Sequence, residues 1–282
     1  MKKEEIDGCI EDKFKKIARY FHKAVDNFET EDINDFRIEI KKLKVFLHLI
    51  NMESGDELLY RITKRMKTIY GYLGVIRNLQ LQLKKMNEYV KKTSGNIPVR
   101  YVHMLEKELE FWKKISKDFI VADYDFFNDK KEIINTLPDK LTKRSIRKFI
   151  HYTLYELQTI SGHPDDYSLD NTRKFIEDIY YNYAFIKPFV TERQTNLFDE
   201  EKVGACLELF NNFRDTCMVI VLLQTYGANE FNESEKKLLK EMENDWMHEK
   251  KELKDQLFAK LDSLHITANN INEFAFEDAL SE

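Results

Sequence analysis

Apolar residues recur at helical spacing along almost the whole of this 282-residue chain, and no other feature constrains the fold as strongly. In residues 34–50, a helix of about 3.6 residues per turn would align one apolar stripe, made of Phe36, Ile40, Leu43, Leu47 and Ile50. Glycine and proline, which interrupt helices, number only 8 and 4. The sequence therefore predicts an all-α protein.

A basic stripe lies beside this apolar stripe and consists of Arg37, Lys41, Lys44 and His48. Such a stripe is ordinarily a solvated face. Residues 34–92, however, contain thirteen Lys or Arg against six Asp or Glu, a local charge of +7 in a chain of net charge -5. A local positive field concentrates anions even on an acidic protein. The segment therefore predicts a confined binding site for a polyanion.

The last third of the chain has the opposite charge. Residues 192–282 contain twenty acidic and ten basic side chains, a local charge of -10. A general nucleic-acid coat is disfavoured by this acidic part. We expect it to offer a surface for a protein partner instead.

Helical periodicity and its interruptions predict two sets of helices. The first set is expected near residues 9–28, 32–51, 55–71, 73–92 and 98–120, and the second near 131–160, 166–190, 199–226 and 233–264. Gly or Pro marks the breaks at 54–55, 94–98, 161–164 and 226–227. Residues 265–282 are acidic and weakly periodic, and we expect them to be a mobile tail.

The two sets of helices share three anchors in the same order. Arg37 aligns with Arg173, Arg77 with Arg214, and Trp112 with Trp246; the arginines are 40 residues apart in the first copy and 41 in the second. Chance similarity between amphipathic helices is the alternative explanation. The pattern predicts a duplication within a single domain, 1–282, with two antiparallel helical bundles, 1–122 and 130–264, related by a pseudo-two-fold axis.

Several classes of protein are disfavoured by what the sequence lacks. No run of about 18 apolar residues would span a membrane, and the amino terminus does not resemble a signal peptide. Cys9, Cys206 and Cys217 lack metal-ligand spacing, and neither a Gly-rich phosphate loop nor an HExxH motif occurs. We therefore expect a cytoplasmic protein with no membrane contact, metal, cofactor or catalytic residues.

Two motifs resemble the signatures of the CHAD family, the conserved histidine α-helical domain. Residues 34–44, NDFRIEIKKLK, resemble H-x-x-R-V-x-x-(K/R)-(K/R)-x-(K/R), and residues 73–80, LGVIRNLQ, resemble L-G-x-x-R-D-L-D. The second half resembles the family in Arg173, Tyr181 and Arg214-Asp215. The resemblance covers most of residues 10–230 and is stronger in the first half.

The resemblance implies two helical bundles around a basic groove that binds inorganic polyphosphate without catalysis, in association with polyphosphate granules. By position in the motifs it implicates Arg37, Lys41, Lys44 and Arg77, with Arg173 and Arg214 as counterparts in the second half. The helix-face pattern alone adds Arg61, Lys64, Arg65, Arg144 and Arg147.

The chain also departs from the family's pattern. Asn34 and Asp170 stand where the namesake histidines are expected, and Glu177 and Tyr180 stand at basic positions of the second half. The alternative hypothesis is therefore a scaffold that kept the fold, lost polyphosphate binding and works through protein partners. A nucleic-acid-binding module and a polyphosphate hydrolase are less favoured.

Overall fold

The structure is a computed structural model that describes residues 1–54, 61–93, 96–120, 124, 126–159, 165–190, 199–227 and 231–264. Its described helices are α1 (Lys3–Asn27), α2 (Thr30–Ser54), α3 (Lys64–Thr93), α4 (Val99–Phe119), α5 (Phe127–Ile134), α6 (Lys143–Thr159), α7 (Asp166–Ile186), α8 (Glu200–Gly227) and α9 (Glu233–Ser263), with a short 3₁₀ helix at Lys187–Phe189. The predicted all-α fold is confirmed. None of the helices in these ranges combines the length and apolar character needed to cross a membrane.

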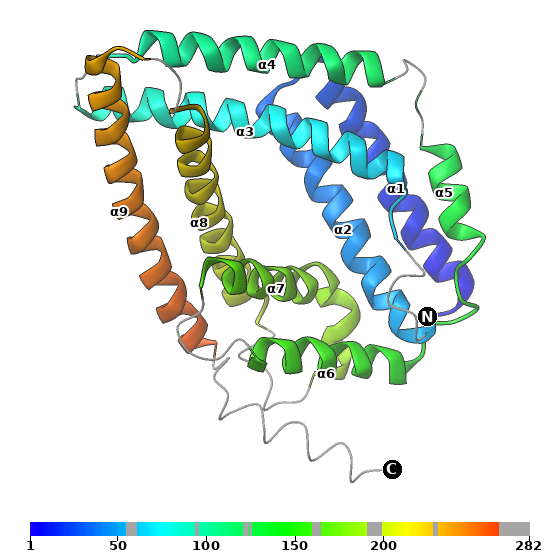
Figure 1. The fold of residues 1–282 in the computed structure, drawn as a ribbon. Helices are drawn as coiled ribbons and strands as arrows, with labels where there is room; N and C mark the ends of the chain where they lie inside the picture. The colour runs from blue at the N-terminus through cyan, green and yellow to red at the C-terminus, as the bar shows by residue number, and fades with distance from the viewer. Residues whose placement is uncertain are drawn as a thin grey trace.

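The helices form two groups that meet through α2, α3, α7 and α8 (Figure 1). In the first group α2 packs against α1 and α3, and α4 covers α3; in the second, α7 packs against α6 and α8, and α9 covers α8. Contacts of α2 with α6 and α7, and of α3 with α8, join the groups. The molecule thus places α2, which carries the basic stripe, and the strongly basic α3 directly against the second group.

The anchors of the predicted duplication lie at corresponding places in their helices. Arg37 and Arg173 are each the eighth residue of α2 and α7, and Trp112 and Trp246 are each the fourteenth residue of α4 and α9. Arg77 and Arg214 are the fourteenth and fifteenth residues of α3 and α8. The duplication stays a prediction, and this agreement supports it.

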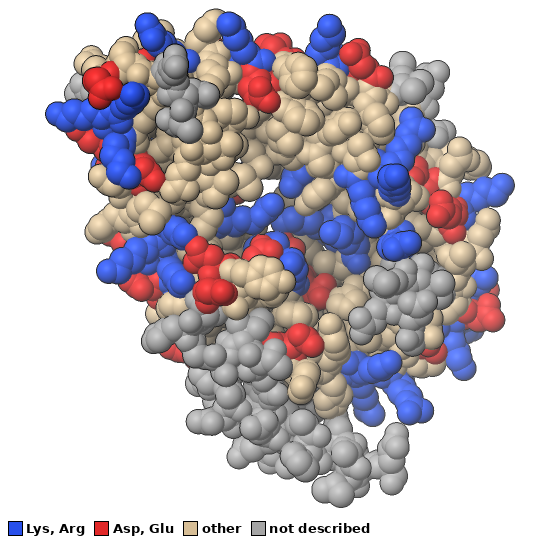
Figure 2. All heavy atoms as spheres, in the orientation of Figure 1, with Lys and Arg blue, Asp and Glu red and all other residues tan. Residues whose placement is uncertain are grey.

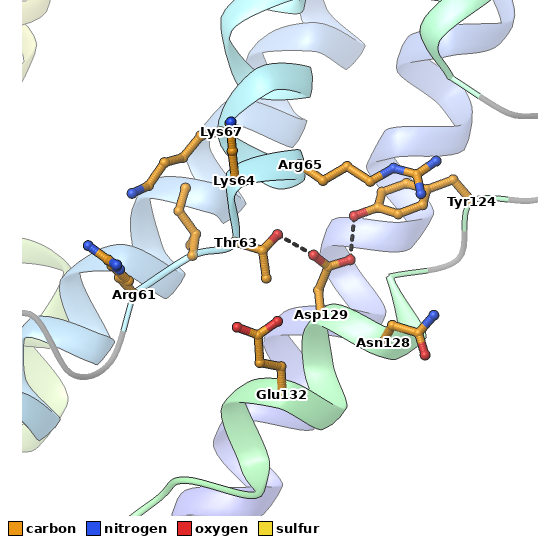
Figure 3. A pocket seen from close by; sticks show the side chains of 10 residues that line it. Arg61, Thr63, Lys64, Arg65, Lys67, Tyr124, Asn128, Asp129 and Glu132 are labelled. Atoms are coloured by element: carbon orange, nitrogen blue, oxygen red, sulfur yellow. Dashed lines mark hydrogen bonds between the residues drawn. The ribbon is translucent and has the colours of Figure 1, made fainter.

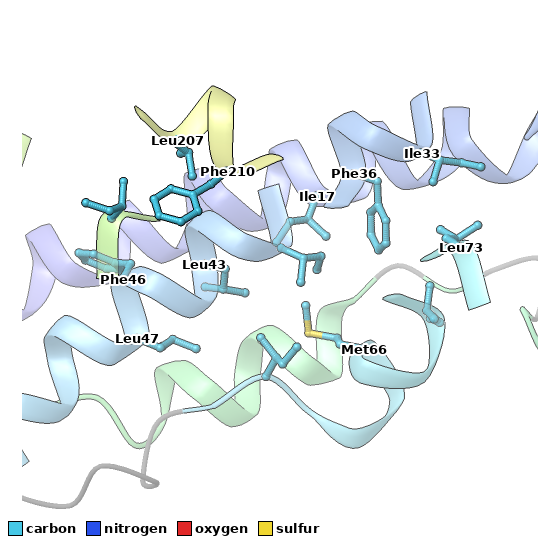
Figure 4. Close-up of a cluster of buried hydrophobic side chains, with 14 of the residues drawn as sticks. Ile17, Ile33, Phe36, Leu43, Phe46, Leu47, Met66, Leu73, Leu207 and Phe210 are labelled. Atoms are coloured by element: carbon cyan, nitrogen blue, oxygen red, sulfur yellow. The ribbon is translucent and has the colours of Figure 1, made fainter. Parts of the chain in front are cut away.

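The apolar stripe of α2 forms the centre of the core, as its spacing predicts. Phe36, Ile40, Leu43, Leu47 and Ile50 are all buried, and Figure 4 shows three of them beside Met66 and Leu73 of α3 and Leu207 and Phe210 of α8. Polar caps set the starts of two helices of the second group. Asp165 accepts a hydrogen bond from the Ser168 amide, and Asn232 accepts one from the Glu235 amide, both at 2.8 Å.

Several of the predicted helix boundaries are wrong. The first helix is expected to begin near residue 9, but α1 begins at Lys3. Residues 64–71 and 73–92, which are expected in two separate helices, form one helix, α3, which starts at Lys64 and passes through Gly71 and Gly74 because apolar contacts continue on both sides of them. The helix expected at 131–160 is interrupted between α5 and α6. Pro138 lies in the interruption, where its ring and missing N–H oppose a continuous helix. The predicted tail, 265–282, lies outside the described residues.

Truncation of Phe36 tests how much the core depends on α2. Its ring is fully buried, with the Phe21 ring 5.6 Å away. We expect Phe36→Ala to lower the free energy of unfolding by about 3–5 kcal/mol, because the change removes buried surface and leaves a cavity. Urea denaturation measures the loss. Phe111→Ala, which truncates a ring that is 55% exposed on α4, is the control and is expected to change stability by less than about 0.5 kcal/mol.

Candidate functional site

Lysine and arginine side chains gather around a hollow in the middle of one face of the molecule. Figure 2 shows this hollow, and Figure 1, in the same orientation, shows α2, α3 and α7 around it. The structure divides most of the predicted binding residues into three sets: one at the contact of α2 with α7, one where α3 meets α8, and one at the start of α3. Their charges are balanced in different ways.

At the contact of α2 with α7, the cations are neutralised by carboxylates of the protein. The Lys41 ammonium donates to Glu177 Oε1 at 2.6 Å, and the Arg173 guanidinium lies 2.6 Å from the same oxygen. Arg173 also pairs with Asp170 at 2.9 Å. The side chains of Lys41, Arg173 and Glu177 are only 15%, 8% and 8% exposed, so water contributes little to balancing these charges. We therefore assign this set mainly to holding α2 against α7.

The protonation of this set reflects both burial and pairing. Burial lowers the pKa of Lys41, although the attraction of Glu177 opposes the shift. Burial alone would lower the pKa of Arg173 as well, but Glu177 and Asp170 outweigh it and raise the pKa. Each cation is thus stabilised in its charged form by a carboxylate of α7.

Two neighbours extend this contact toward solvent. His48 Nδ1 of α2 and Asp178 Oδ2 of α7 are 2.9 Å apart, and burial raises the pKa of Asp178 despite this contact. Lys44 is exposed, and its ammonium lies 6.0 Å from the centroid of the Tyr70 ring. Lys44 is therefore the member of the basic stripe of α2 that remains accessible to a ligand.

Where α3 meets α8, Arg77 makes a bidentate pair with Asp215. Its Nη1 and Nη2 atoms lie 2.6 Å and 2.5 Å from the two carboxylate oxygens, and its Nε donates to Asn34 Oδ1 at 3.1 Å. All three guanidinium nitrogens of Arg77 thus donate hydrogen bonds, two to Asp215 of α8 and one to Asn34 of α2. Arg77 links the two groups of helices.

Arg37 is 9% exposed and lies between α2 and α3. Its Nη1 donates to the Tyr70 carbonyl at 2.6 Å, and its Cζ lies 4.0 Å from the centroid of the Tyr70 ring. A Cβ at Gly74 would overlap with the guanidinium, so this position of the Leu73-Gly74 motif needs glycine. Burial, and then the charges of Arg214 and Arg77 nearby, lower the pKa of Arg37. Arg37 and Arg77 therefore lie between the helices and already donate hydrogen bonds to oxygen atoms of the protein.

A cavity of about 880 Å³ at the start of α3 carries the third set of cations. Four basic side chains line it: Arg61, Lys64, Arg65 and Lys67. Within the described chain none of the four forms an ion pair, and Arg65 stacks on Tyr124, with its Cζ 4.1 Å from the ring centroid. The set is thus positive and open to solvent.

The acidic wall of this cavity is mostly engaged with neighbouring hydroxyl groups. Asp129 accepts hydrogen bonds from Thr63 and from Tyr124, as the dashed lines in Figure 3 show, and it is only 6% exposed. Thr63 also accepts from the Met66 amide at 3.2 Å and so caps α3. Glu132 lines the same cavity. The two carboxylates do not cancel the four cations, and the wall keeps a net positive charge.

Arg144 and Arg147 are exposed on α6, outside these three sets. The structure therefore does not bring every predicted residue together.

Lys67 is not among the predicted binding residues, although it shares the helix face of Lys64. The pairing of Arg173 with Glu177 follows the i, i+4 spacing that favours such a pair on a helix. No comparable signal points to Asp215, because its partner is 138 residues away.

Comparison with known protein structures supports the fold. No family model and no curated protein matches the chain. It is similar to the crystal structure of the CHAD domain from the plant Ricinus communis, with a TM-score of 0.72 and 13% identity over 93% of this chain and 91% of that one. It is also similar to PptA from Streptomyces chartreusis, with a TM-score of 0.65 and 10% identity over 93% and 99% of the two chains. The protein has a CHAD-like fold.

Removal of the charge of Glu177 tests the first set. We expect Glu177→Gln to lower the free energy of unfolding by about 3–5 kcal/mol, because Lys41 loses its buried counter-ion and Arg173 keeps only Asp170. Urea denaturation measures this loss. The control, Asp12→Asn, removes a carboxylate that is 71% exposed and pairs with Lys15, and it is expected to cost less than about 1 kcal/mol. Equal effects of the two changes would show that Glu177 is not structurally important.

Proposed function

We propose that this protein binds inorganic polyphosphate, without catalysing a reaction, through the lysines and arginines around the hollow of Figure 2. The observation that carries the proposal is the cavity at the start of α3, where four cations lack an ion-pair partner within the described chain. The CHAD-like fold supports it. The proposal places the protein in the cytoplasm, in association with polyphosphate granules.

The chemistry of the cavity suits a flexible chain of phosphates. Arginine offers a planar fork of donors to phosphate oxygens, and lysine offers a mobile point charge. Lys64, Arg65 and Lys67 lie within the first turn of α3, and Arg61 comes just before it, so the four cations are close together along the chain. Arg61, Lys64, Arg65 and Lys67 are therefore proposed as primary contacts, and the exposed Lys44 as a secondary one. Arg144 and Arg147 are proposed to contact only a longer chain.

The paired cations have a different part in the proposal. Arg37, Lys41, Arg77 and Arg173 already donate to oxygen atoms of the protein, so a ligand must compete with these atoms. We propose that they hold α2, α3, α7 and α8 in place and add positive potential to the hollow. This internal pairing also favours the second candidate, a scaffold that works through protein partners, because it reduces the number of free cations.

The salt dependence of binding tests the cavity. We expect Lys64→Gln with Lys67→Gln to weaken the binding of medium-chain polyphosphate and to reduce the slope of log affinity against log salt by roughly 0.7 for each contact removed. Calorimetric titration at several salt concentrations measures the slope. Lys91→Gln with Lys92→Gln, at the other end of α3, removes the same charge from exposed positions and is expected to leave the slope unchanged.

The same titration separates the two candidate functions. Single-stranded DNA of equal charge is the competitor, and failure of DNA to displace polyphosphate would support a polyphosphate site. If the unaltered protein binds neither polymer, the proposed function is wrong and the scaffold hypothesis is favoured. If both pairs of substitutions have equal effects, the site lies elsewhere on the basic surface.

A further inference from the structure

A second cavity, of about 370 Å³, lies between α7, α8 and α9. Its walls are largely apolar and include Leu169, Phe210, Phe213 and Ile220, which are buried. Val221 and Met247 line it as well, and these two side chains are 53% and 47% exposed. The volume falls within the range of roughly 300–1,000 Å³ that is usual for small-molecule sites. The second group of helices thus has an open apolar cavity.

The charges that line this cavity leave one cation unbalanced. Asp170 pairs with Arg173 at 2.9 Å, and Asp166 pairs with Lys250. The remaining charged side chain of the lining is Arg214. No carboxylate within the described ranges pairs with Arg214, so the lining keeps one positive charge.

The predicted duplication explains why Arg214 lacks a counter-ion. In the first half, Arg77 pairs with Asp215, which follows Arg214 in α8. The residue that follows Arg77 is Asn78, an amide that carries no charge. A reciprocal ion pair between Arg214 and the first half therefore cannot form at that position. Arg214 is left with its charge at the edge of an apolar cavity.

We propose that this cavity binds an amphiphilic anion, a ligand with an apolar chain and a carboxylate or phosphate head. The chain contacts Phe210, Phe213 and Met247, and the head pairs with Arg214. Polyphosphate does not suit the cavity, because apolar walls offer nothing to its charged oxygens. The inference therefore does not depend on the proposed polyphosphate function. A fatty acid and the phosphate ester of an apolar alcohol share the required chemistry.

Calorimetric titration with decanoate, decyl phosphate and the neutral decyl glucoside, each below its micelle-forming concentration, tests the proposal. We expect both anions to bind at least tenfold more tightly than the glucoside, and Arg214→Gln to remove this preference. Arg100→Gln, which removes an exposed arginine of α4, is the matched control and is expected to change nothing. The more tightly bound of the two anions indicates which head group the site accepts.

A second variant probes the apolar walls without altering Arg214. We expect Met247→Glu to weaken the binding of both anions tenfold or more, while Phe111→Glu, at a similarly exposed apolar position of α4, leaves it unchanged. No saturable binding of either anion by the unaltered protein would overturn the proposal. Equal binding of the glucoside, or an anion preference that survives Arg214→Gln, would overturn it as well. Polyphosphate binding measured on the same sample is a separate result.

Discussion

The ion pairs of Glu177 connect the two groups of helices, and the arrangement of the basic face depends on them. The buried carboxylate of Glu177 in α7 accepts a hydrogen bond from Lys41 of α2 and forms an ion pair with Arg173 of its own helix. The desolvation of such charges offsets most of their attraction, so the apolar residues of α2 and α7 supply the net stability of the contact. The ion pairs instead fix how α2 lies against α7, since any shift would leave a charge buried without a partner. Asn182 supports the same register by donating to the Val45 carbonyl at 3.0 Å.

This constraint divides the basic residues by function. Cations between the helix groups are balanced by Glu177, Asp170 and Asp215, and removing their partners would disturb the fold before it affected a ligand. The cations at the start of α3 have no ion-pair partner in the described part of the chain, and they line a cavity of about 880 Å³. Affinity for a polyanion depends on charges that are free to exchange counter-ions, so the cavity at α3 is better suited to binding than the central pairs.

Some of this structure is predictable from sequence, and the reason is locality. The stripe from Phe36 to Ile50 and the basic stripe beside it depend only on helical geometry, so spacing is enough to identify both. The boundary at Lys64 depends on which residues pack against α3, and sequence periodicity does not contain that information. Arg37 illustrates the limit most clearly, because its type and position suggest an exposed ligand contact, whereas packing on Tyr70 and Gly74 makes it an inner residue. Residues 55–60 are outside the described part of the chain, so their predicted helix stays a prediction.

The positions of the paired residues connect the fold to the asymmetry of the site. In the predicted duplication Lys41 corresponds to Glu177, and these two side chains contact each other at 2.6 Å. In that predicted duplication, two equivalent residues that touch would lie close to the axis relating the copies. Two cations at the positions of Lys41 and Glu177 would repel each other unless a bound anion lay between them. Because residue 177 is a glutamate, its carboxylate balances Lys41 and no bound anion is required. At Arg77 and Arg214 only one of the two equivalent arginines is balanced. Asp215 neutralises Arg77, whereas Asn78, which corresponds to Asp215, carries no charge to neutralise Arg214. In the predicted duplication the two halves thus share one closed contact, Lys41 with Glu177, while the cavity at the start of α3 and the cavity between α7, α8 and α9 are lined by different residues.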